Sequence, residues 1–203
     1  MENTYPLLNR AREYARDFTE RIRLKQKRFY EKDFKDMISL EEKIRNDSKR
    51  INLDFLDPEA YFSLGESLYS LFRENSLINR DVDEDILNDS IRALLNVKEI
   101  VHLENPQKLT ITRFIGKDLS LLPQTLFILS QAYLEKAFIE MRKQNMDIGN
   151  ACLYLSLSED NRDLVTYYDS FPLKSKEVKY HYKRLDKMKE FLDHKRQQII
   201  NHL

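Results

Sequence analysis

The sequence predicts a predominantly α-helical protein, and three observations support this fold class. The 203 residues include only 3 Gly and 5 Pro, too few for a turn-rich all-β protein. No Gly or Pro occurs between Leu7 and Asp57. Hydrophobic residues recur every three or four positions along most of the chain, which is the period of an amphipathic helix. We therefore expect six or seven helices in a compact bundle or a helical-hairpin repeat.

The N-terminal part of the chain carries two hydrophobic stripes. The first runs from Leu7 to Ile22 and the second from Tyr30 to Ile44. The polar run from Lys25 to Arg28 lies between them and shifts the phase of the pattern. Either one kinked long helix or two helices that meet near this run would explain the shift.

Two further helices have recognisable starts. Asp57 is suited to the N-cap and Pro58 to the first helical position, ahead of a stripe that reaches Phe72. The acidic stretch 81–85 suits the positive N-terminal end of the next helix, which we expect to continue through Leu95.

The segment 99–115 has two interpretations that the sequence leaves open. Ile100–Leu103 and Leu109–Thr112 are apolar or β-branched and flank a polar turn. They would form a short β-hairpin. Equally, the first run would end a helix and the second would belong to an extended connector.

The last third of the sequence predicts three helices. Helical periodicity covers 119–144, with Pro123 tolerated in the first turn. Asp147 is suited to cap a short helix with Ile148, Leu153 and Leu157 in its stripe. Ser175 is suited to cap the final helix, whose stripe is formed by Val178, Tyr182, Leu185, Leu192 and Ile199.

The domain organisation follows from these elements. We expect one α-helical domain over 1–203, which subdivides into N-terminal helices at 1–57, central hairpins at 58–170 and a basic C-terminal helix at 171–203.

Charge is distributed unevenly along the chain. Residues 1–50 hold 14 basic and 10 acidic side chains, whereas residues 51–106 hold 4 basic and 12 acidic side chains. Residues 107–203 hold 16 and 12, so basic ends flank an acidic middle. The terminal helices would then neutralise the middle, or each face would meet a different partner.

Composition also limits the location and the partners. Lys and Arg number 34 and so do Asp and Glu, which gives no global preference for nucleic acid or acidic lipid. No apolar run approaches the ~20 residues of a membrane-spanning helix, so we expect no membrane partner. The single cysteine, Cys152, and the lack of a secretory signal favour an intracellular, cytoplasmic protein, with the nucleus left open.

Two short motifs share the same spacing of large and small residues. Tyr61-x-x-Leu64-Gly65-x-x-Leu68 and Leu126-x-x-Leu129-Ser130-x-x-Tyr133 each place a small residue between large ones. A small residue at the centre lets a second helix cross closely. The spacing resembles the opening of a tetratricopeptide repeat.

This resemblance covers two first helices and departs from the family downstream. The family has a small residue twelve positions after the first one, where this chain has Leu77 and Arg142. The resemblance implies a groove that binds a peptide or a helix. It therefore implies that eight residues bind a partner: Tyr61, Leu64, Gly65, Leu68, Leu126, Leu129, Ser130 and Tyr133.

The common catalytic motifs are absent from the sequence. It contains no glycine-rich phosphate loop, no nucleophile elbow and no H-E-x-x-H zinc motif. Glu190 and His194 are four residues apart on the last helix, but no third ligand is suggested by spacing. We therefore expect no cofactor and no metal, and the sequence favours a non-enzymatic protein.

One catalytic alternative remains on the last helix. Arg196 and His202 have a spacing that is similar to the Arg…His motif of HEPN-type helical ribonucleases. The resemblance implies that His202 would act as the base and Arg196 would hold the phosphate. No metal would be required.

The basic ends of the chain predict a second alternative, which is binding of RNA or single-stranded nucleic acid. Aromatic residues beside Lys and Arg can stack on unpaired bases while the cations contact phosphates. The candidates are Arg21, Arg23, Lys25, Lys27 and Arg28 near the N-terminus, and Lys179, Tyr182, Lys183 and Arg184 near the C-terminus.

The function that the sequence favours is protein–protein interaction. Amphipathic helices, the split charge and the missing catalytic motifs all permit it. We expect an intracellular helical adaptor or complex subunit, with nucleic-acid binding and the HEPN-type ribonuclease as the alternatives.

Overall fold

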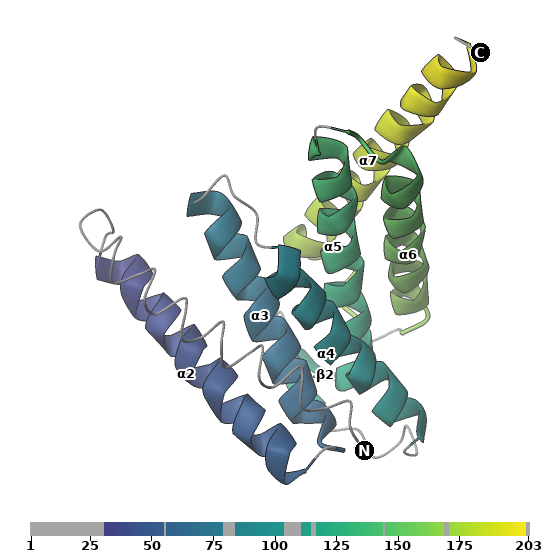
Figure 1. Cartoon of the computed structure of the whole chain (residues 1–203). Coiled ribbons are helices and arrows are strands. Elements are labelled where there is room, and N and C mark those ends of the chain that lie inside the picture. The colour runs from purple at the N-terminus through teal and green to yellow at the C-terminus, as the bar shows by residue number, and fades with distance from the viewer. Residues whose placement is uncertain are drawn as a thin grey trace. The chain divides into compact units, whose positions relative to one another are not determined.

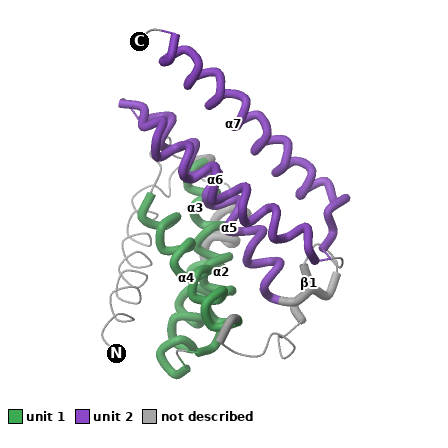
Figure 2. Tube along the Cα trace, turned by 90° about the vertical axis from the view of Figure 1, so that its right-hand side faces the viewer, with its two compact units in different colours: residues 1–104 green, residues 105–203 purple. Residues whose placement is uncertain are grey.

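The structure is a computed structural model that describes residues 31–54, 56–78, 84–103, 111–114, 117–143, 145–168 and 171–201. In these ranges the chain forms six α-helices and one two-stranded β-ribbon (Figure 1). The prediction of a predominantly α-helical fold is therefore confirmed. The chain forms two compact units with a boundary between Glu104 and Asn105 (Figure 2). The sequence does not mark this boundary, and the subdivision at 57 and 170 stays a prediction.

Unit 1 contains three described helices. These are α2 (Glu31–Leu53), α3 (Pro58–Ile78) and α4 (Glu84–Leu103), and α3 packs against both of the others. The Asp57 carboxylate accepts a hydrogen bond from the backbone N–H of Ala60 at 2.9 Å, which confirms the predicted N-cap. The predicted stripe from Leu7 to Ile22 lies outside the described residues.

A close crossing of α3 and α4 holds this unit together. The Ser90 hydroxyl on α4 donates to the backbone carbonyl of Gly65 on α3 at 2.7 Å. A Cβ atom at Gly65 would lie 2.7 Å from Cγ of Leu94, which is too close for a side chain to fit without movement. The absence of a side chain at Gly65 therefore allows the two helices to approach this closely.

Unit 2 contains a short β-ribbon and three helices. The strands are β1 (Ile111–Phe114) and β2 (Lys117–Ser120), which pair antiparallel with Ile111 opposite Ser120. The helices are α5 (Leu121–Arg142), α6 (Ile148–Thr166) and α7 (Lys176–Ile200). Helix α5 packs against α6, and α7 packs against both. Asp147 and Ser175 accept hydrogen bonds from the backbone N–H groups of Asn150 and Val178, so both predicted caps are confirmed.

The hairpin predicted within 99–115 is not supported. Ile100–Leu103 forms the last turn of α4, so its first predicted strand is helical. Ile100 and Val101 are buried and continue the helical stripe of Leu94 and Val97, and this periodicity outweighs their β propensity. The alternative of a helix end was correct for this run, and the β-ribbon of the structure begins later, at Ile111.

The α5–α6 crossing uses small residues in the same way as the α3–α4 crossing. The Ser158 hydroxyl on α6 donates to the backbone carbonyl of Ser130 on α5 at 2.6 Å. The Ser130 hydroxyl donates in return to the backbone carbonyl of Ser158 at 2.8 Å. Hydroxyl-to-backbone bonds in both directions require the two helices to lie close together, which their small side chains permit.

Helix α7 covers the α5–α6 hairpin with a stripe of alternating three- and four-residue spacing. Its buried residues are Val178, His181, Leu185, Met188 and Leu192. Leu185 and Leu192 join Leu134 of α5 and Leu155 of α6 in one core. The predicted stripe was wrong at two positions, because Tyr182 is only half-buried and Ile199 is exposed.

None of the helices in the described ranges combines the length and apolar character needed to cross a bilayer.

The close crossing at Gly65 makes a testable prediction. Gly65→Ala should lower the free energy of unfolding by about 1–2 kcal/mol, because overpacking against buried Leu94 outweighs the gain in helix propensity. Gly149→Ala is the matched control, since its Cβ would lie 3.4 Å from the nearest atom, an ordinary contact. Urea denaturation measures both, and equal stability of the two variants would contradict the packing described for Gly65.

Candidate functional site

The eight residues predicted to bind a partner are buried inside the two hairpins. Gly65, Leu68, Leu129 and Ser130 are among them, and the other four are also classed as buried. Residues spaced i, i+3, i+4 and i+7 mark one face of a helix, and each hairpin uses this face for its own packing. The structure therefore corrects the predicted site, because a partner cannot reach these side chains.

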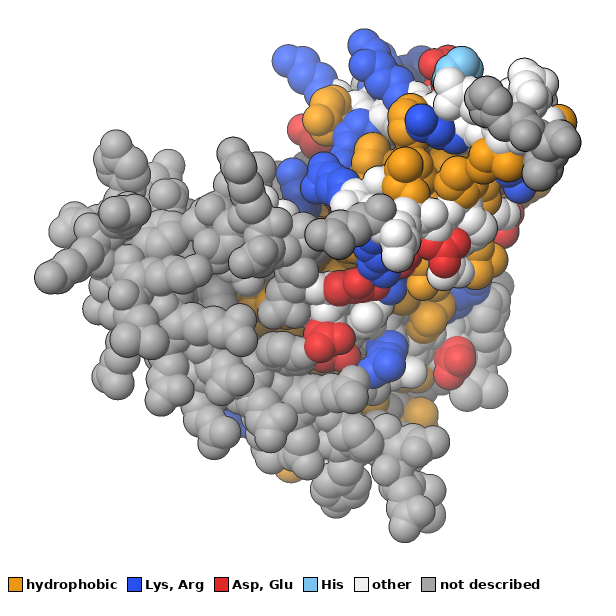
Figure 3. All heavy atoms as spheres, turned by 45° about the horizontal axis from the view of Figure 1, so that its top comes forward, with side chains coloured by type: hydrophobic (Ala, Val, Ile, Leu, Met, Phe, Trp, Pro, Cys, Tyr) orange, Lys and Arg blue, Asp and Glu red, His pale blue; other side chains and the backbone are white. Residues whose placement is uncertain are grey.

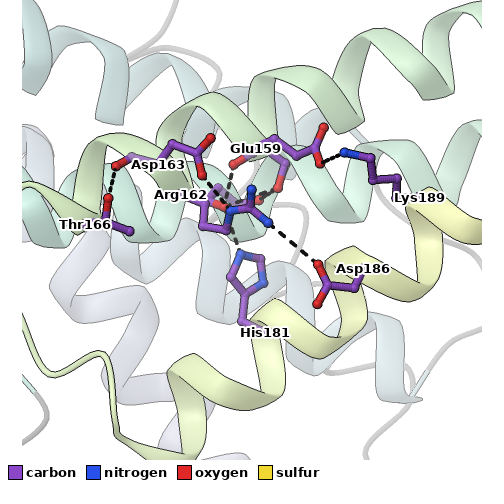
Figure 4. Close-up of polar contacts among 9 residues, drawn as sticks. Glu159, Arg162, Asp163, Thr166, His181, Asp186 and Lys189 are labelled. Carbon is purple, nitrogen blue, oxygen red and sulfur yellow. Dashed lines mark hydrogen bonds and ion pairs between the residues drawn. The ribbon is translucent and has the colours of Figure 1, made fainter.

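A buried polar cluster joins the three helices of unit 2. The Ser130 hydroxyl lies 2.8 Å from Nε2 of His181, in addition to its bonds with Ser158. Figure 4 shows the His181 ring pointing from α7 toward α6. The tautomer that fits a Ser130 hydroxyl donating to the Ser158 carbonyl has the His181 proton on Nε2, which then donates to the Ser130 oxygen. Nδ1 of His181 is then an acceptor, and it has no hydrogen-bond partner in the described part of the chain.

His181 is held in its neutral form by this position. Its pKa is lowered to about 3, chiefly by burial and in addition by the nearby cations Arg184 and Arg162. The ring packs edge-on against Phe127, with the two ring centres 5.4 Å apart. His181 therefore behaves as a core residue near neutral pH.

The Ser130–His181 pair has the distance that a nucleophile and its base require, but not the surroundings. Both side chains are buried, so a substrate cannot reach the hydroxyl. A catalytic base is normally oriented by a third group on its other nitrogen, whereas Nδ1 of His181 has no such partner among the described residues. The cluster is therefore structural: it fastens α7 to the α5–α6 crossing.

Charged contacts surround this cluster at the surface. Arg162 of α6 bonds to its neighbour Asp163 at 2.9 Å and lies 3.7 Å from Asp186 of α7 (Figure 4). Lys189 of α7 pairs with Glu159 of α6 at 2.9 Å. The Arg162–Asp186 and Lys189–Glu159 pairs link α6 to α7 at the surface, where screening by solvent keeps the contribution of such pairs to stability small.

Part of the predicted nucleic-acid set is engaged inside unit 2. Arg184 bonds to Glu135 of α5 at 2.7 Å and lies over the Phe138 ring. The Tyr182 ring lies under the guanidinium of Arg162. Lys179 and Lys183 are exposed. The five N-terminal candidates, Arg21, Arg23, Lys25, Lys27 and Arg28, lie outside the described residues.

The exposed aromatic residues of α7 differ from those predicted. Tyr180 is 66% exposed and Phe191 is 44% exposed. With Lys183 and Lys187 they occupy positions i, i+3, i+7 and i+11, which share one side of a helix. The sequence could not separate Tyr180 from Tyr182, because both lie next to basic residues and only the packing of α7 shows which faces solvent.

The metal candidate Glu190–His194 and Arg196 of the ribonuclease candidate lie in the C-terminal half of α7. Among the described residues, no group of three or more His, Cys, Asp or Glu side chains could hold a metal ion. His194 instead lies 3.0 Å from the side-chain nitrogen of Gln198. Arg196 is exposed, whereas His202 lies outside the described residues, so the ribonuclease pair stays a prediction.

Helix α6 carries a hydrophobic stripe on the side that faces away from the core. Leu153 is 54% exposed, Leu164 is 40% exposed and Tyr167 is 81% exposed, while Leu157 is half-buried. Together with exposed Asp160, these residues lie at positions i, i+4, i+7, i+11 and i+14. We call the five residues the outer face of α6.

The opposite side of α6 forms its packing face. Ala151, Leu155, Ser158 and Val165 are buried there. Helix α6 is therefore apolar on two opposite sides, and among the described residues of unit 2 only one of these sides is buried. A helix with a single core-facing stripe places charged and polar residues on the other side, so the outer face needs a separate explanation.

The surface view shows how apolar and charged groups are distributed. In Figure 3 hydrophobic side chains gather on the described part of the displayed face, and Lys, Arg, Asp and Glu side chains lie around and among them. Exposed apolar patches mark interaction sites in many proteins.

No protein-family model, curated protein or solved structure matches this chain. The geometry of its own surface therefore has to indicate the function.

The buried histidine predicts a specific pH dependence of stability. The unfolded chain binds the His181 proton below a pKa of about 6.5, whereas the folded protein binds it only near 3. The contribution of His181 is therefore complete above pH 6.5. It should fall by about 1.4 kcal/mol per pH unit as the pH drops toward 3.

Urea denaturation between pH 6.5 and 4.5 measures this effect. His181→Gln should remove most of the difference between these two pH values, whatever its stability at neutral pH. His194→Gln, which replaces an exposed histidine, should keep it. If wild type and His181→Gln lose stability equally on acidification, the buried neutral state of His181 is wrong.

Proposed function

We propose that this chain is a non-enzymatic helical module that binds another protein through the outer face of α6. The observation that carries the proposal is the second apolar stripe of α6, formed by Leu153, Leu157, Leu164 and Tyr167. None of these four side chains is among the buried residues of α6. Their exposure is therefore best explained by an interaction outside unit 2.

The energetics support binding at this stripe. Full burial of a Leu side chain stabilises a complex by about 1.5–3 kcal/mol before the costs of association. Three leucines and a tyrosine in one line would form the apolar centre of an interface. Tyrosine is also enriched among the residues that dominate binding energy. One helix face is smaller than the ~800 Å² that a typical partner buries, so neighbouring surfaces would contribute as well.

The proposal retains the helical-hairpin repeat as its architecture. Two features support a relationship between α3–α4 and α5–α6: each first helix carries the small-residue motif, and each second helix carries a serine that bonds to it. In the first hairpin the serine of the second helix lies 25 positions after the small residue of the first helix, and in the second hairpin it lies 28 positions after it. The tetratricopeptide family has a spacing of twelve positions between its two small residues. The hairpins would thus be long-helix variants of the tetratricopeptide pattern, with their binding surface on the outside.

A set of polar substitutions tests the proposed surface. The triple variant Leu153→Gln, Leu164→Gln, Tyr167→Ser should lose the protein partner that wild type retains in affinity purification from cells that express the chain. Its unfolding free energy should change by less than about 0.5 kcal/mol per substitution, since exposed side chains contribute little to stability.

The control removes apolar surface of similar size elsewhere. Leu53 at the end of α2 and Leu56 in the connection to α3 are exposed, so Leu53→Gln, Leu56→Gln should retain the partner. Quantitative mass spectrometry of the bound fractions compares the three proteins. A partner that is bound equally by the triple variant and by wild type would rule out the outer face of α6 as the binding surface.

Nucleic-acid binding is the second candidate, and the exposed side of α7 favours it. Tyr180 and Phe191 would stack on bases, while Lys183 and Lys187 between them would contact phosphates. The acidic residues Glu190 and Asp193 on the same helix oppose such binding. We therefore rank this function below protein binding.

Salt dependence tests the nucleic-acid candidate directly. If Lys183 and Lys187 each contact a phosphate, Lys183→Gln, Lys187→Gln should lower the slope of log affinity against log salt by about 1.4 for single-stranded RNA. Fluorescence anisotropy with labelled oligouridine measures this slope. Undetectable binding at low salt, or a slope that the double variant leaves unchanged, would remove this candidate.

A further inference from the structure

We infer that the outer face of α6 binds an amphipathic helix of a partner protein whose polar side carries Lys and Arg. The inference rests on the proposed function and specifies the chemistry of the partner. Two features of α6 carry it, namely the straight line of its exposed apolar residues and the sign of the charges that accompany them.

The exposed residues form one narrow ridge. At about 100° per residue, the four apolar side chains fall within about 80° of one another around the helix axis, and Asp160 lies within the same sector. The ridge extends from Leu153 to Tyr167, a length of about 21 Å at 1.5 Å per residue. A single convex ridge of this kind fits the groove between side-chain rows of another helix. Partner helices of this type present apolar residues at i, i+3, i+4 and i+7.

The charged residues of this face are acidic. Asp160 lies on the ridge and exposed Asp163 lies at its edge. The one basic residue in the α6 sequence, Arg162, lies on the opposite side of the helix and contacts Asp163 and Asp186. The Asp160 carboxylate forms no hydrogen bond or ion pair within the described part of the chain, so it is available to a partner.

A partner that covers the leucines must also accommodate Asp160. Removing a carboxylate from water without a compensating partner is strongly unfavourable. A Lys or Arg on the incoming helix would avoid this cost and would set its register and direction. The acidic residues also disfavour nucleic acid on this face, because they repel phosphates.

A second copy of this chain is a less suitable occupant. Its α7 offers Lys183 and Lys187 beside Tyr180, but Glu190 and Asp193 follow within two turns. Like charges would then face Asp160 or Asp163 along part of the contact. A helix with uniformly basic flanks fits the whole ridge better.

Two synthetic peptides test the inference with the full chain. Both have about 18 residues and place leucine at helical spacing; one has lysine at the polar positions and the other has glutamate. Fluorescence anisotropy should show that wild type binds the lysine peptide about tenfold more tightly than the glutamate peptide. Asp160→Lys should reduce or reverse this preference. Asp193→Lys makes the same charge change on exposed α7 and should leave the preference intact.

Three results would overturn the inference. The first is a lack of binding of the lysine peptide, and the second is an equal effect of Asp160→Lys and Asp193→Lys. The third is self-association in sedimentation velocity that Asp160→Lys abolishes, which would make a second copy the occupant. The proposed function is tested separately by the triple variant on α6. A failure of the peptide experiment would therefore overturn the basic-helix inference without deciding whether the outer face of α6 binds a protein.

Discussion

The reciprocal hydrogen bonds between Ser130 and Ser158 determine how α6 is rotated about its own axis. Each hydroxyl donates to the backbone carbonyl of the other serine, so Ser158 must face α5 at close range. This rotation buries Leu155 with Ser158 and turns Leu153 and Leu164 to solvent. His181 bonds to the same Ser130 hydroxyl and thereby fastens α7 to the crossing. The exposed surface of unit 2 is thus a consequence of one buried polar contact.

The same kind of contact occurs in both hairpins: a serine hydroxyl of the second helix donates to a backbone carbonyl of the first helix. In unit 1 the hydroxyl of Ser90 donates to the carbonyl of Gly65, and in unit 2 a serine replaces the glycine. Buried polar groups are costly unless they are paired, so each crossing favours one alignment of its helices over shifted ones. The apolar residues on either side supply the packing energy, whereas the serines select the register. Most of the outer face of α6 lies outside this packing, since Leu153, Asp160, Leu164 and Tyr167 are exposed.

The sequence predicts the helices well because their signals are local. Caps at Asp57, Asp147 and Ser175 depend on residues within one turn, and the small-residue motif correctly marks close helix crossings. The proposed binding face could not be predicted in this way. Leu153 and Leu155 are chemically identical, and periodicity alone cannot show which side of a doubly apolar helix is covered. Likewise, the β propensity of Ile100 and Val101 did not indicate that α4 continues through these two residues. Burial is a property of the assembled units and not of a sequence window.

The most direct test of this account is the reactivity of single cysteines along α6. With Cys152→Ser as the background, one cysteine at a time replaces residues 151, 153, 155, 157, 158, 160, 164, 165 or 167, and modification by a maleimide is timed in the folded protein. The account predicts fast reaction at 153, 160, 164 and 167 and slow reaction at 151, 155, 158 and 165, with a period of about 3.6 residues. Uniform rates, or slow reaction at 153, 164 and 167, would contradict it, because α6 would then not present a free apolar face.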